Sequence, residues 1–235
     1  NAVKNAAIFA PYPFTILLYG ETGTGKELFA RYIHEMSNRE GRYLPCNCAS
    51  IPETLAESTF FGHRKGAFTG AERDHEGLFE TAEKGTLFLD EVEALPMLIQ
   101  SKLLRTLDEK ENLNLKEIQP VGSQETQEVD VRVLLSSNEN LSRLAAEGKF
   151  RKDFFYRFST VIQLPPLRER MEDIPLIAER MLIRFRSNLQ KDQLYLSDSA
   201  CDKLLQYSWK NGNVRELLHV IQNACVLAND CILPE

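Results

Sequence analysis

The sequence lacks the marks of membrane, secreted and DNA-gripping proteins. No apolar run approaches the ~20 residues of a membrane-spanning helix, and no charged-then-apolar leader opens the chain. We therefore expect a cytoplasmic protein with no membrane contact. Lysine and arginine number 28 against 34 acidic residues, which gives a net charge of −6. Because a domain that holds DNA by its phosphates usually has a basic excess, we expect this chain to bind no DNA directly.

The cysteines exclude a zinc site and a disulfide framework. Their number is odd, and no pair of C-x-x-C units exists, so the spacing of zinc ligands is absent. We expect reduced thiols in the protein core at all of these positions: Cys46, Cys48, Cys201, Cys225 and Cys231.

What the sequence does contain is a set of short apolar runs that alternate with segments of helical period. This alternation is typical of an α/β fold with a parallel sheet. The predicted strands are Thr15–Tyr19, Tyr43–Asn47, Thr86–Leu89, Val129–Ser136 and Thr160–Leu164. Helices are predicted between them, among others at Glu27–Met36 and Leu98–Leu107.

After "LPPLRER" the pattern changes, and no further strand of any strength is predicted. Helix starts follow instead: Asp173 with Pro175 for a helix that runs through Phe185, Ser197 or Asp198 for a second, and the capping-box spacing of Asn213 and Glu216 for a third. We therefore expect an α/β nucleotide-binding domain over residues 1–170 and a small helical domain over residues 171–235.

The stretch "TILLYGETGTGKE" runs from an apolar strand into G-x-x-x-x-G-K and then into a helix. Gly20, Gly23 and Gly25 let the backbone curl so that N–H groups point inward, where the helix N-terminus adds its positive end. Lys26 would reach the β- and γ-phosphates. Glu27 stands where most such loops place Ser or Thr for Mg²⁺, so the ion must depend more on other ligands or on water. The alternative interpretation is a glycine-rich turn whose lysine is only solvated, and such a turn would not require this strand–loop–helix context.

Two later strands end in residues suited to the same chemistry. "GTLFLDE" ends in Asp90, which would hold Mg²⁺ directly or through water, and Glu91, which would polarise the attacking water. "VRVLLSSN" ends at Asn138, which at the carboxyl edge of a parallel sheet could hydrogen-bond the γ-phosphate or the water. From local sequence alone, a helix N-cap or turn is the better interpretation of Asn138.

Three arginines are candidates for contact with a transferring phosphate, whose charge arginine stabilises in the transition state. "KFRKDFFYRF" holds Arg151 and Arg157, for which a surface ion pair is the commoner role. "GNVRELL" places Arg215 in the first turn of a helix, where a cation opposes the helix dipole and so suggests an anionic partner. A neighbouring carboxylate would serve Arg215 equally well.

Taken together, these motifs resemble the central AAA+ ATPase domain of bacterial enhancer-binding proteins, the activators of sigma-54-dependent transcription, over almost the whole chain. GETGTGKE is similar to the family's Walker A motif, GTLFLDE to Walker B, SSN to sensor I, FRKDFFYRF to its arginine-finger segment, LPPLRERMEDI to its linker and NVREL to sensor II. The resemblance implies that these residues bind the nucleotide, with Asp90 also at the metal: Gly20, Glu21, Thr22, Gly23, Thr24, Gly25, Lys26, Glu27, Asp90 and Arg215.

The resemblance also implies catalytic roles for Glu91, Asn138, Arg151, Arg157 and Asn47. The two arginines would reach into the neighbouring subunit's site. Asn47, in "YLPCNCAS", would restrain Glu91 until the target engages.

The hexapeptide GAFTGA is the family's hallmark and stands here unaltered between the two Walker motifs. The resemblance implies that it projects from a ring and contacts sigma-54, with Phe68 in apolar contact and Thr69 coupling the loop to the nucleotide state. The partner-binding residues would be Gly66, Ala67, Phe68, Thr69, Gly70 and Ala71. On physics alone, a buried hairpin with Phe68 in the core stays open.

The implied fold is an AAA+ P-loop NTPase with a five-stranded parallel sheet and a helical lid. The implied activity is ATP hydrolysis with Mg²⁺ by a homo-oligomeric ring, a hexamer in the family, that remodels the closed complex of sigma-54 RNA polymerase into the open complex and so activates transcription. Two segments depart from the family pattern: Trp209–Asn213 is one residue longer than W-P-G-N and lacks its proline, and the segment between Leu107 and Val121 is several residues longer than usual.

Two rival functions remain open at this point. One is another AAA+ machine, such as an unfoldase or a helicase loader, which GAFTGA disfavours. The other is a nucleotide-gated assembly module that binds ATP without turnover, which Glu91, Arg151 and Arg157 disfavour. The sequence names neither a sensed signal nor a target promoter, because it shows no sensory domain and no helix-turn-helix.

Overall fold

The computed structural model describes residues 2–108, 114–228 and 231–232. By their contacts these residues form two compact units: one of residues 1–19 and 26–163, the other of residues 20–25 and 164–235. Helices in the described part of the chain are all too short or too polar to cross a membrane. The strand–loop–helix motif is divided between the two units by its contacts. Its strand and helix belong to the first unit, and its loop belongs to the second.

The first unit is built on a five-stranded parallel sheet of order β2-β3-β6-β1-β7. Its strands are β1 (Ile16–Tyr19), β2 (Tyr43–Asn47), β3 (Thr86–Asp90), β6 (Arg132–Ser137) and β7 (Thr160–Gln163). The predicted parallel sheet is confirmed, and four of the five predicted strands end within one residue of their observed bounds. The apolar runs locate these strands because β1, β3 and β6 are buried on both faces.

The remaining predicted strand, Val129–Ser136, is wrong as a single element. The chain forms β5 (Gln127–Asp130), breaks at Val131 and continues as β6. Strand β5 pairs antiparallel with β4 (Leu115–Ile118) in a separate hairpin, whereas β6 pairs parallel with β1 and β3. An apolar run does not show where a strand changes its partner.

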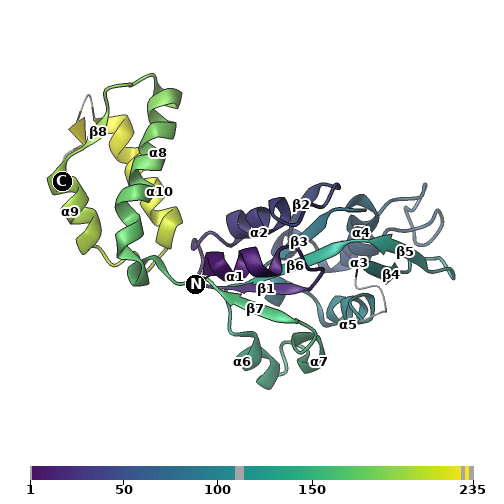
Figure 1. The fold of residues 1–235 in the computed structure, drawn as a ribbon. Coiled ribbons are helices and arrows are strands. Elements are labelled where there is room, and N and C mark those ends of the chain that lie inside the picture. Colours follow the sequence, from purple (N-terminus) through teal and green to yellow (C-terminus); the bar gives the residue numbers. More distant parts are fainter. Residues whose placement is uncertain (1, 109–113, 229–230, 233–235) are drawn as a thin grey trace. The chain divides into compact units, whose positions relative to one another are not determined.

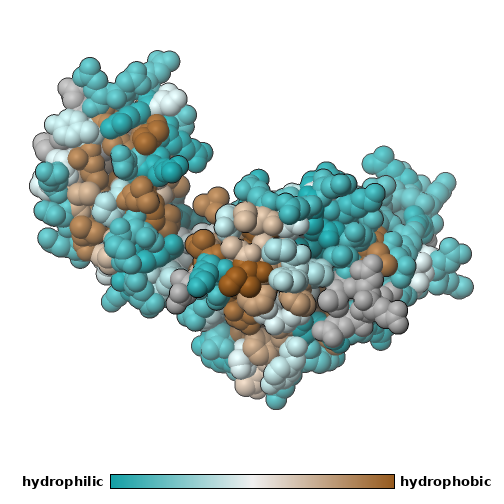
Figure 2. Space-filling model, in the orientation of Figure 1, coloured by the Kyte–Doolittle hydropathy of each residue, from teal (hydrophilic) through white to brown (hydrophobic). Residues whose placement is uncertain are grey.

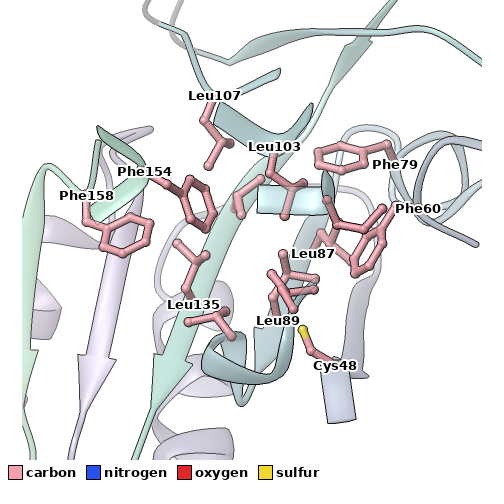
Figure 3. Packing of buried hydrophobic residues seen from close by; sticks show 14 of the residues in the cluster. Cys48, Phe60, Phe79, Leu87, Leu89, Leu103, Leu107, Leu135, Phe154 and Phe158 are labelled. Carbon is pink, nitrogen blue, oxygen red and sulfur yellow. The ribbon is translucent and has the colours of Figure 1, made fainter. Parts of the chain in front are cut away.

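Helices cover both faces of the sheet (Figure 1). Helix α1 (Ala2–Phe9) and helix α2 (Lys26–Glu35) lie on one face, and the apolar cluster of Figure 3 packs on the other. In that cluster Leu87 and Leu89 of β3 meet Phe60, Phe79 and Leu103 from three helices. The helices on this face are α3 (Glu53–Phe61), α4 (Leu78–Thr81), α5 (Met97–Thr106), α6 (Leu141–Ala146) and α7 (Lys152–Phe155), with the short 3-10 turns η1 (Cys48–Ser50) and η2 (Val92–Ala94).

The second unit is helical. It contains α8 (Ile174–Leu189), α9 (Asp198–Gln206) and α10 (Asn213–Leu227), after the 3-10 turns η3 (Leu167–Glu169) and η4 (Met171–Asp173). Ser197 caps α9 through its side chain, as predicted, and Pro175 lies in the first turn of α8. The expectation of no strand here is wrong by one small pair, because β8 (Tyr195–Leu196) and β9 (Cys231–Ile232) align in parallel.

The capping box predicted for α10 is also wrong in its first member. The N-cap is Gly212, and the Glu216 carboxylate accepts the Gly212 N–H at 3.1 Å. Asn213 instead has a left-handed backbone with φ 51° and is 1% exposed. Tertiary partners therefore decide the role of this asparagine.

The cysteines that the structure describes are free thiols. Cys48 and Cys225 are buried, as expected, whereas Cys46 and Cys201 are only partly covered, and the Cys231 side chain lies outside the described residues. Burial raises the pKa of Cys46 to about 11 and raises that of Cys48 further. These thiols are therefore protonated and unreactive at neutral pH.

Much of the surface in view is hydrophilic, with hydrophobic side chains gathered in places (Figure 2). In the first unit, Val3 and Ile8 of α1 and Val161 of β7 are more than half exposed. In the second unit, Leu176 and Ile183 of α8 are likewise exposed.

Candidate functional site

Three strands end side by side at one edge of the sheet. In the parallel register Tyr19 lies beside Ser137, and Leu89 lies beside Leu135, so β1, β6 and β3 finish together. Asp90, the last residue of β3, accepts a hydrogen bond from the buried Ser136 hydroxyl of β6. This edge holds a fixed carboxylate on β3, separated by β6 from β1, the strand from which the glycine-rich loop departs.

The loop from Gly20 to Gly25 has the backbone that its glycines predict. Gly23 and Gly25 have φ values of 79° and 100°, a region that favours glycine. The Thr24 hydroxyl donates to the Glu21 carbonyl oxygen at 2.8 Å and closes the turn. Helix α2 then begins at Lys26, which is 8% exposed, while Glu27 is exposed.

Glu91 follows Asp90 in a left-handed conformation, with φ 57° and ψ 51°. For a residue other than glycine this costs of order 1–3 kcal/mol and persists only where the surroundings enforce it. Such strain concentrates at functional sites, and here it falls on the residue predicted to polarise water.

Asn47 ends β2 beside Asp90 in the parallel register. Its side-chain oxygen accepts the Ala49 N–H at 2.8 Å and caps η1. Among the hydrogen bonds of the described residues, none joins Asn47 to Glu91. The restraint of Glu91 by Asn47 therefore stays a prediction for another state of the protein.

Asn138 follows β6 directly, at the edge where β3 ends. Its backbone N–H donates to Oε1 of Glu93 at 3.2 Å, and Oε2 of Glu93 is buried without a partner among the described residues. The N-cap of α6 is Asn140, which accepts the Arg143 N–H at 3.0 Å. The alternative in which Asn138 itself caps this helix is therefore wrong.

Arg151 and Arg157 flank α7, and each pairs with a carboxylate of its own chain. Arg151 donates to both oxygens of Asp153, at 3.0 and 2.7 Å, and Arg157 pairs with Asp108. About a third of each arginine side chain remains exposed, at 35% and 31%. Both guanidinium groups thus lie at the surface, where exposed ion pairs are weak and exchangeable.

Arg215 lies in the first turn of α10 and is exposed. Within the same unit it is close to the loop, since a Cβ placed on Gly23 would lie 3.1 Å from the Arg215 Cβ. Sequence reasoning missed two residues nearby, Arg168 and Asn213, which bind Glu21. No local sequence pattern marks these two residues, because their partner, Glu21, is far away in the sequence.

The hexapeptide from Gly66 to Ala71 forms a loop in which Gly66 and residues 68–70 are exposed, Ala67 is partly covered and Ala71 is buried. Gly66 and Gly70 have φ values of 81° and 99°, and the Gly66 N–H donates to the Ala71 carbonyl oxygen at 2.8 Å. Phe68 is 43% exposed and meets only the edge of His63 among the ring contacts of the described residues, with centroids 4.8 Å apart. The alternative in which Phe68 is a core residue is therefore wrong.

The base of this loop is fixed to its surroundings. His63 pairs with His75 across the base and with Val121 of the β4–β5 connection. Lys65 N–H donates to the Asp74 carboxylate at 2.7 Å. The loop therefore has a base held beside the β4–β5 connection, while residues 68–70 at its tip are exposed.

Family models match nearly the whole chain. The sigma-54 interaction domain matches residues 1–164, and an AAA+ ATPase lid domain matches residues 168–234. The chain belongs to the sigma-54 interaction domain family. Its α/β unit and helical unit are those of the AAA+ fold, as the motifs predicted.

Curated relatives of this family member are transcriptional regulators. It is 44% identical over 232 residues to the regulatory protein AtoC of Escherichia coli, which covers 98% of this chain and 49% of that protein. It is 49% identical over 223 residues to the regulatory protein LuxO of Vibrio cholerae, which covers 94% of this chain and 41% of that protein. The chain thus spans about half the length, or less, of the curated relatives it matches.

Solved structures give the same fold. NtrX from Brucella abortus in complex with ATP matches with a TM-score of 0.85 and 32% identity, over 99% of this chain and 53% of that one. A closed-state reconstruction of Hsp104 matches with a TM-score of 0.66 and 19% identity, over 96% of this chain and 43% of that one, and at that identity supports the fold alone.

Proposed function

We propose that this chain is the ATP-hydrolysing module of a sigma-54-dependent transcriptional activator, which remodels the closed complex of sigma-54 RNA polymerase into the open complex in the cytoplasm. The observation that carries the proposal is the pairing of two features in one unit: Asp90 and Glu91 at the end of β3, and an exposed GAFTGA tip on a fixed base. The first suits nucleotide chemistry, and the second suits contact with a protein.

The nucleotide would bind the Gly20–Gly25 loop and Lys26, with Glu21, Thr22, Thr24, Glu27 and Arg215 nearby in sequence or structure. ADP and ATP complexes of the related NtrX support this assignment.

Mg²⁺ fits the residues present: Asp90 offers one carboxylate, and Mg²⁺ in such sites relies on one or two carboxylates, substrate phosphates and water. No cluster of three or more metal-binding side chains occurs in the described residues. Phosphate oxygens and water would supply the remaining ligands. The bound ion would neutralise charge on the phosphates.

Glu91 would polarise the attacking water, and Asn138 would hydrogen-bond the water or the γ-phosphate. Asn138 is held for this by the Glu93 carboxylate. Asn47 would restrain Glu91 in the state before the target engages.

Arg151 and Arg157 would act in a neighbouring subunit's site, which makes the active species a homo-oligomer, a hexamer by resemblance to the family. Support comes from the exposure of both arginines and from that of Tyr156, the residue before Arg157, which is 81% exposed. In the ring, a neighbour's phosphates would replace Asp153 and Asp108 as their anionic partners.

The loop residues Gly66, Ala67, Phe68, Thr69, Gly70 and Ala71 would bind sigma-54, with Phe68 as the apolar anchor. The chain would not itself bind DNA, since its net charge is −6.

The first test is phosphate release by the wild-type chain and by Lys26→Ala. We expect release by the wild type and none above background by Lys26→Ala, because the phosphates lose their main cation. Lys203→Ala, which removes an exposed lysine from α9, is the matched control and should behave as the wild type. A wild-type chain that binds ATP without releasing phosphate at any concentration would favour the nucleotide-gated assembly module instead.

A second test concerns assembly. Mixing Arg151→Ala chains with Lys26→Ala chains should restore part of the phosphate release that each has lost. At some subunit interfaces, a site with an intact Lys26 would then meet a neighbour with an intact Arg151. Phosphate release per chain should also rise with wild-type concentration. Constant activity per chain at all dilutions, with no recovery on mixing, would show that Arg151 does not act on a neighbour.

A further inference from the structure

In the second unit, the carbonyl oxygens of the glycine-rich loop are held by donors from the helical part. Asn213 Nδ2 donates to the Thr22 oxygen at 3.0 Å, the Val214 N–H donates to the Gly23 oxygen at 3.0 Å, and Arg170 Nη2 donates to the Thr24 oxygen at 2.8 Å. Three consecutive peptide units of the loop therefore have fixed acceptors.

Fixing a carbonyl also fixes the N–H of the same peptide unit. In a trans peptide the C=O and N–H bonds point in opposite directions, and no cis bond occurs in the described chain. The donors of the helical part thus turn the N–H groups of Gly23, Thr24 and Gly25 away from themselves. The Thr24 N–H donates to the Glu21 carbonyl oxygen at 3.3 Å within the loop, so the orientation matters for phosphate binding chiefly at Gly23 and Gly25. N–H groups of such a loop are what bind phosphate oxygens.

Asn213 is the central residue of this contact. Its side chain is 1% exposed, and Oδ1 accepts the Leu167 N–H at 2.7 Å. Nδ2 donates both to Thr22 and to the Glu21 carboxylate, the latter at 3.2 Å. Its backbone is left-handed, with φ 51°, a conformation that asparagine tolerates better than most residues. The amide group of Asn213 therefore joins three segments: the start of α10, the chain at Leu167 and the glycine-rich loop.

Glu21 adds a charged contact between the same parts. Arg168 donates to both carboxylate oxygens, at 2.8 and 2.6 Å, in the forked geometry that arginine favours. Arg168 and then Asn213 lower the pKa of Glu21 to about 2, so the carboxylate is ionised at neutral pH.

The close approach needs glycine at position 23 of the loop. A Cβ on Gly23 would lie 2.0 Å from the Gly212 carbonyl oxygen, so the loop and the start of α10 touch backbone to backbone. The Trp209–Asn213 turn has positive φ at both of its ends, 51° at each.

We infer that Asn213 is a positioning residue for phosphate binding: through it the helical part of the second unit orients the loop's N–H groups and so sets the affinity for the β-phosphate. This inference rests on the proposed nucleotide site. By linkage, a bound diphosphate strengthens the attachment of the helical part to the loop by the same factor.

The test compares ADP and AMP affinities, because their ratio isolates the β-phosphate from the adenosine part. Asn213→Gly keeps the left-handed backbone without strain and removes only the side chain. We expect the gain in affinity from AMP to ADP to fall roughly tenfold in this variant, the scale of one or two lost hydrogen bonds. Asn211→Gly, in the exposed part of the same turn, is the matched control and should keep the wild-type ratio.

Asn213→Asp provides a second measurement, since it retains the acceptor for Leu167 but places a second carboxylate against Glu21, and it should lower the ratio further. If thermal melting shows that both Asn213 variants fail to fold, Arg168→Ala carries the test, because it removes the fork on Glu21 from a side chain that is 35% exposed. A wild type without ADP affinity would defeat the proposed nucleotide site. A wild type that binds ADP, with the ADP-to-AMP ratio unchanged in the folded variants, would overturn the positioning role alone.

Discussion

Replacing Glu91 with glutamine is expected to leave ATP binding intact while phosphate release falls by ~100-fold to ~10,000-fold, the range for loss of a general base. Glutamine has nearly the size of glutamate but cannot accept a proton from water. Equilibrium binding of ATP and a phosphate-release assay on the same preparation separate the two effects. Glu40→Gln, at an exposed position before β2, is the matched control and should hydrolyse as the wild type does.

The backbone at Glu91 allows a sharper version of this experiment. Because φ is 57° there, Glu91→Gly should relieve strain and melt at the same temperature as the wild type or higher. It should nevertheless hydrolyse as poorly as Glu91→Gln, since it also lacks the carboxylate. If Glu91 were only a turn residue, the glycine variant would be at least as active as the wild type, and the assigned role would be wrong.

The parts of the fold that the sequence predicted are those set by local pattern. Strands β1 and β3 are apolar runs because both of their faces are buried, and the glycine spacing before Lys26 predicts the curled loop that the structure has. The edge where β1, β3 and β6 end together follows from parallel pairing, so the positions of Asp90 and Asn138 could be expected from the motifs.

What the sequence could not predict depends on partners that are distant in the chain. Val129, Val131 and Val133 alternate with the charged Asp130 and Arg132, and this strand-like alternation runs unbroken through the point where the chain leaves the β4–β5 hairpin for the main sheet, so nothing local marks it. Asn213 and Glu216 have the spacing of a capping box, but the amide of Asn213 binds Leu167 and Thr22 instead, and Gly212 takes the cap. In both cases tertiary hydrogen bonding decided between locally equal alternatives.

Thr69→Ala is expected to retain substantial phosphate release yet to form no open complexes with sigma-54 polymerase. Thr69 lies at the exposed tip of the loop and has no chemistry to offer phosphate, so its loss should affect output rather than hydrolysis. Thr54→Ala, the same change at an exposed position of α3, is the matched control for both assays. Open-complex formation on a sigma-54 promoter, measured beside phosphate release, gives the two readouts.

A ligand shifts an equilibrium only through a difference in its affinity for the two states, so the loop must bind sigma-54 differently in different nucleotide states. We expect the wild type to bind sigma-54 most tightly with ADP and aluminium fluoride, which mimic the transition state. Phe68→Ala should weaken that trapped complex by ~1–3 kcal/mol or more, the scale of an aromatic anchor. Because Phe68 is 43% exposed and meets His63 only edge-on, the same variant should melt close to the wild-type temperature. Equal sigma-54 binding by the wild type, Phe68→Ala and Thr69→Ala on a native gel would mean that the GAFTGA loop is only a turn.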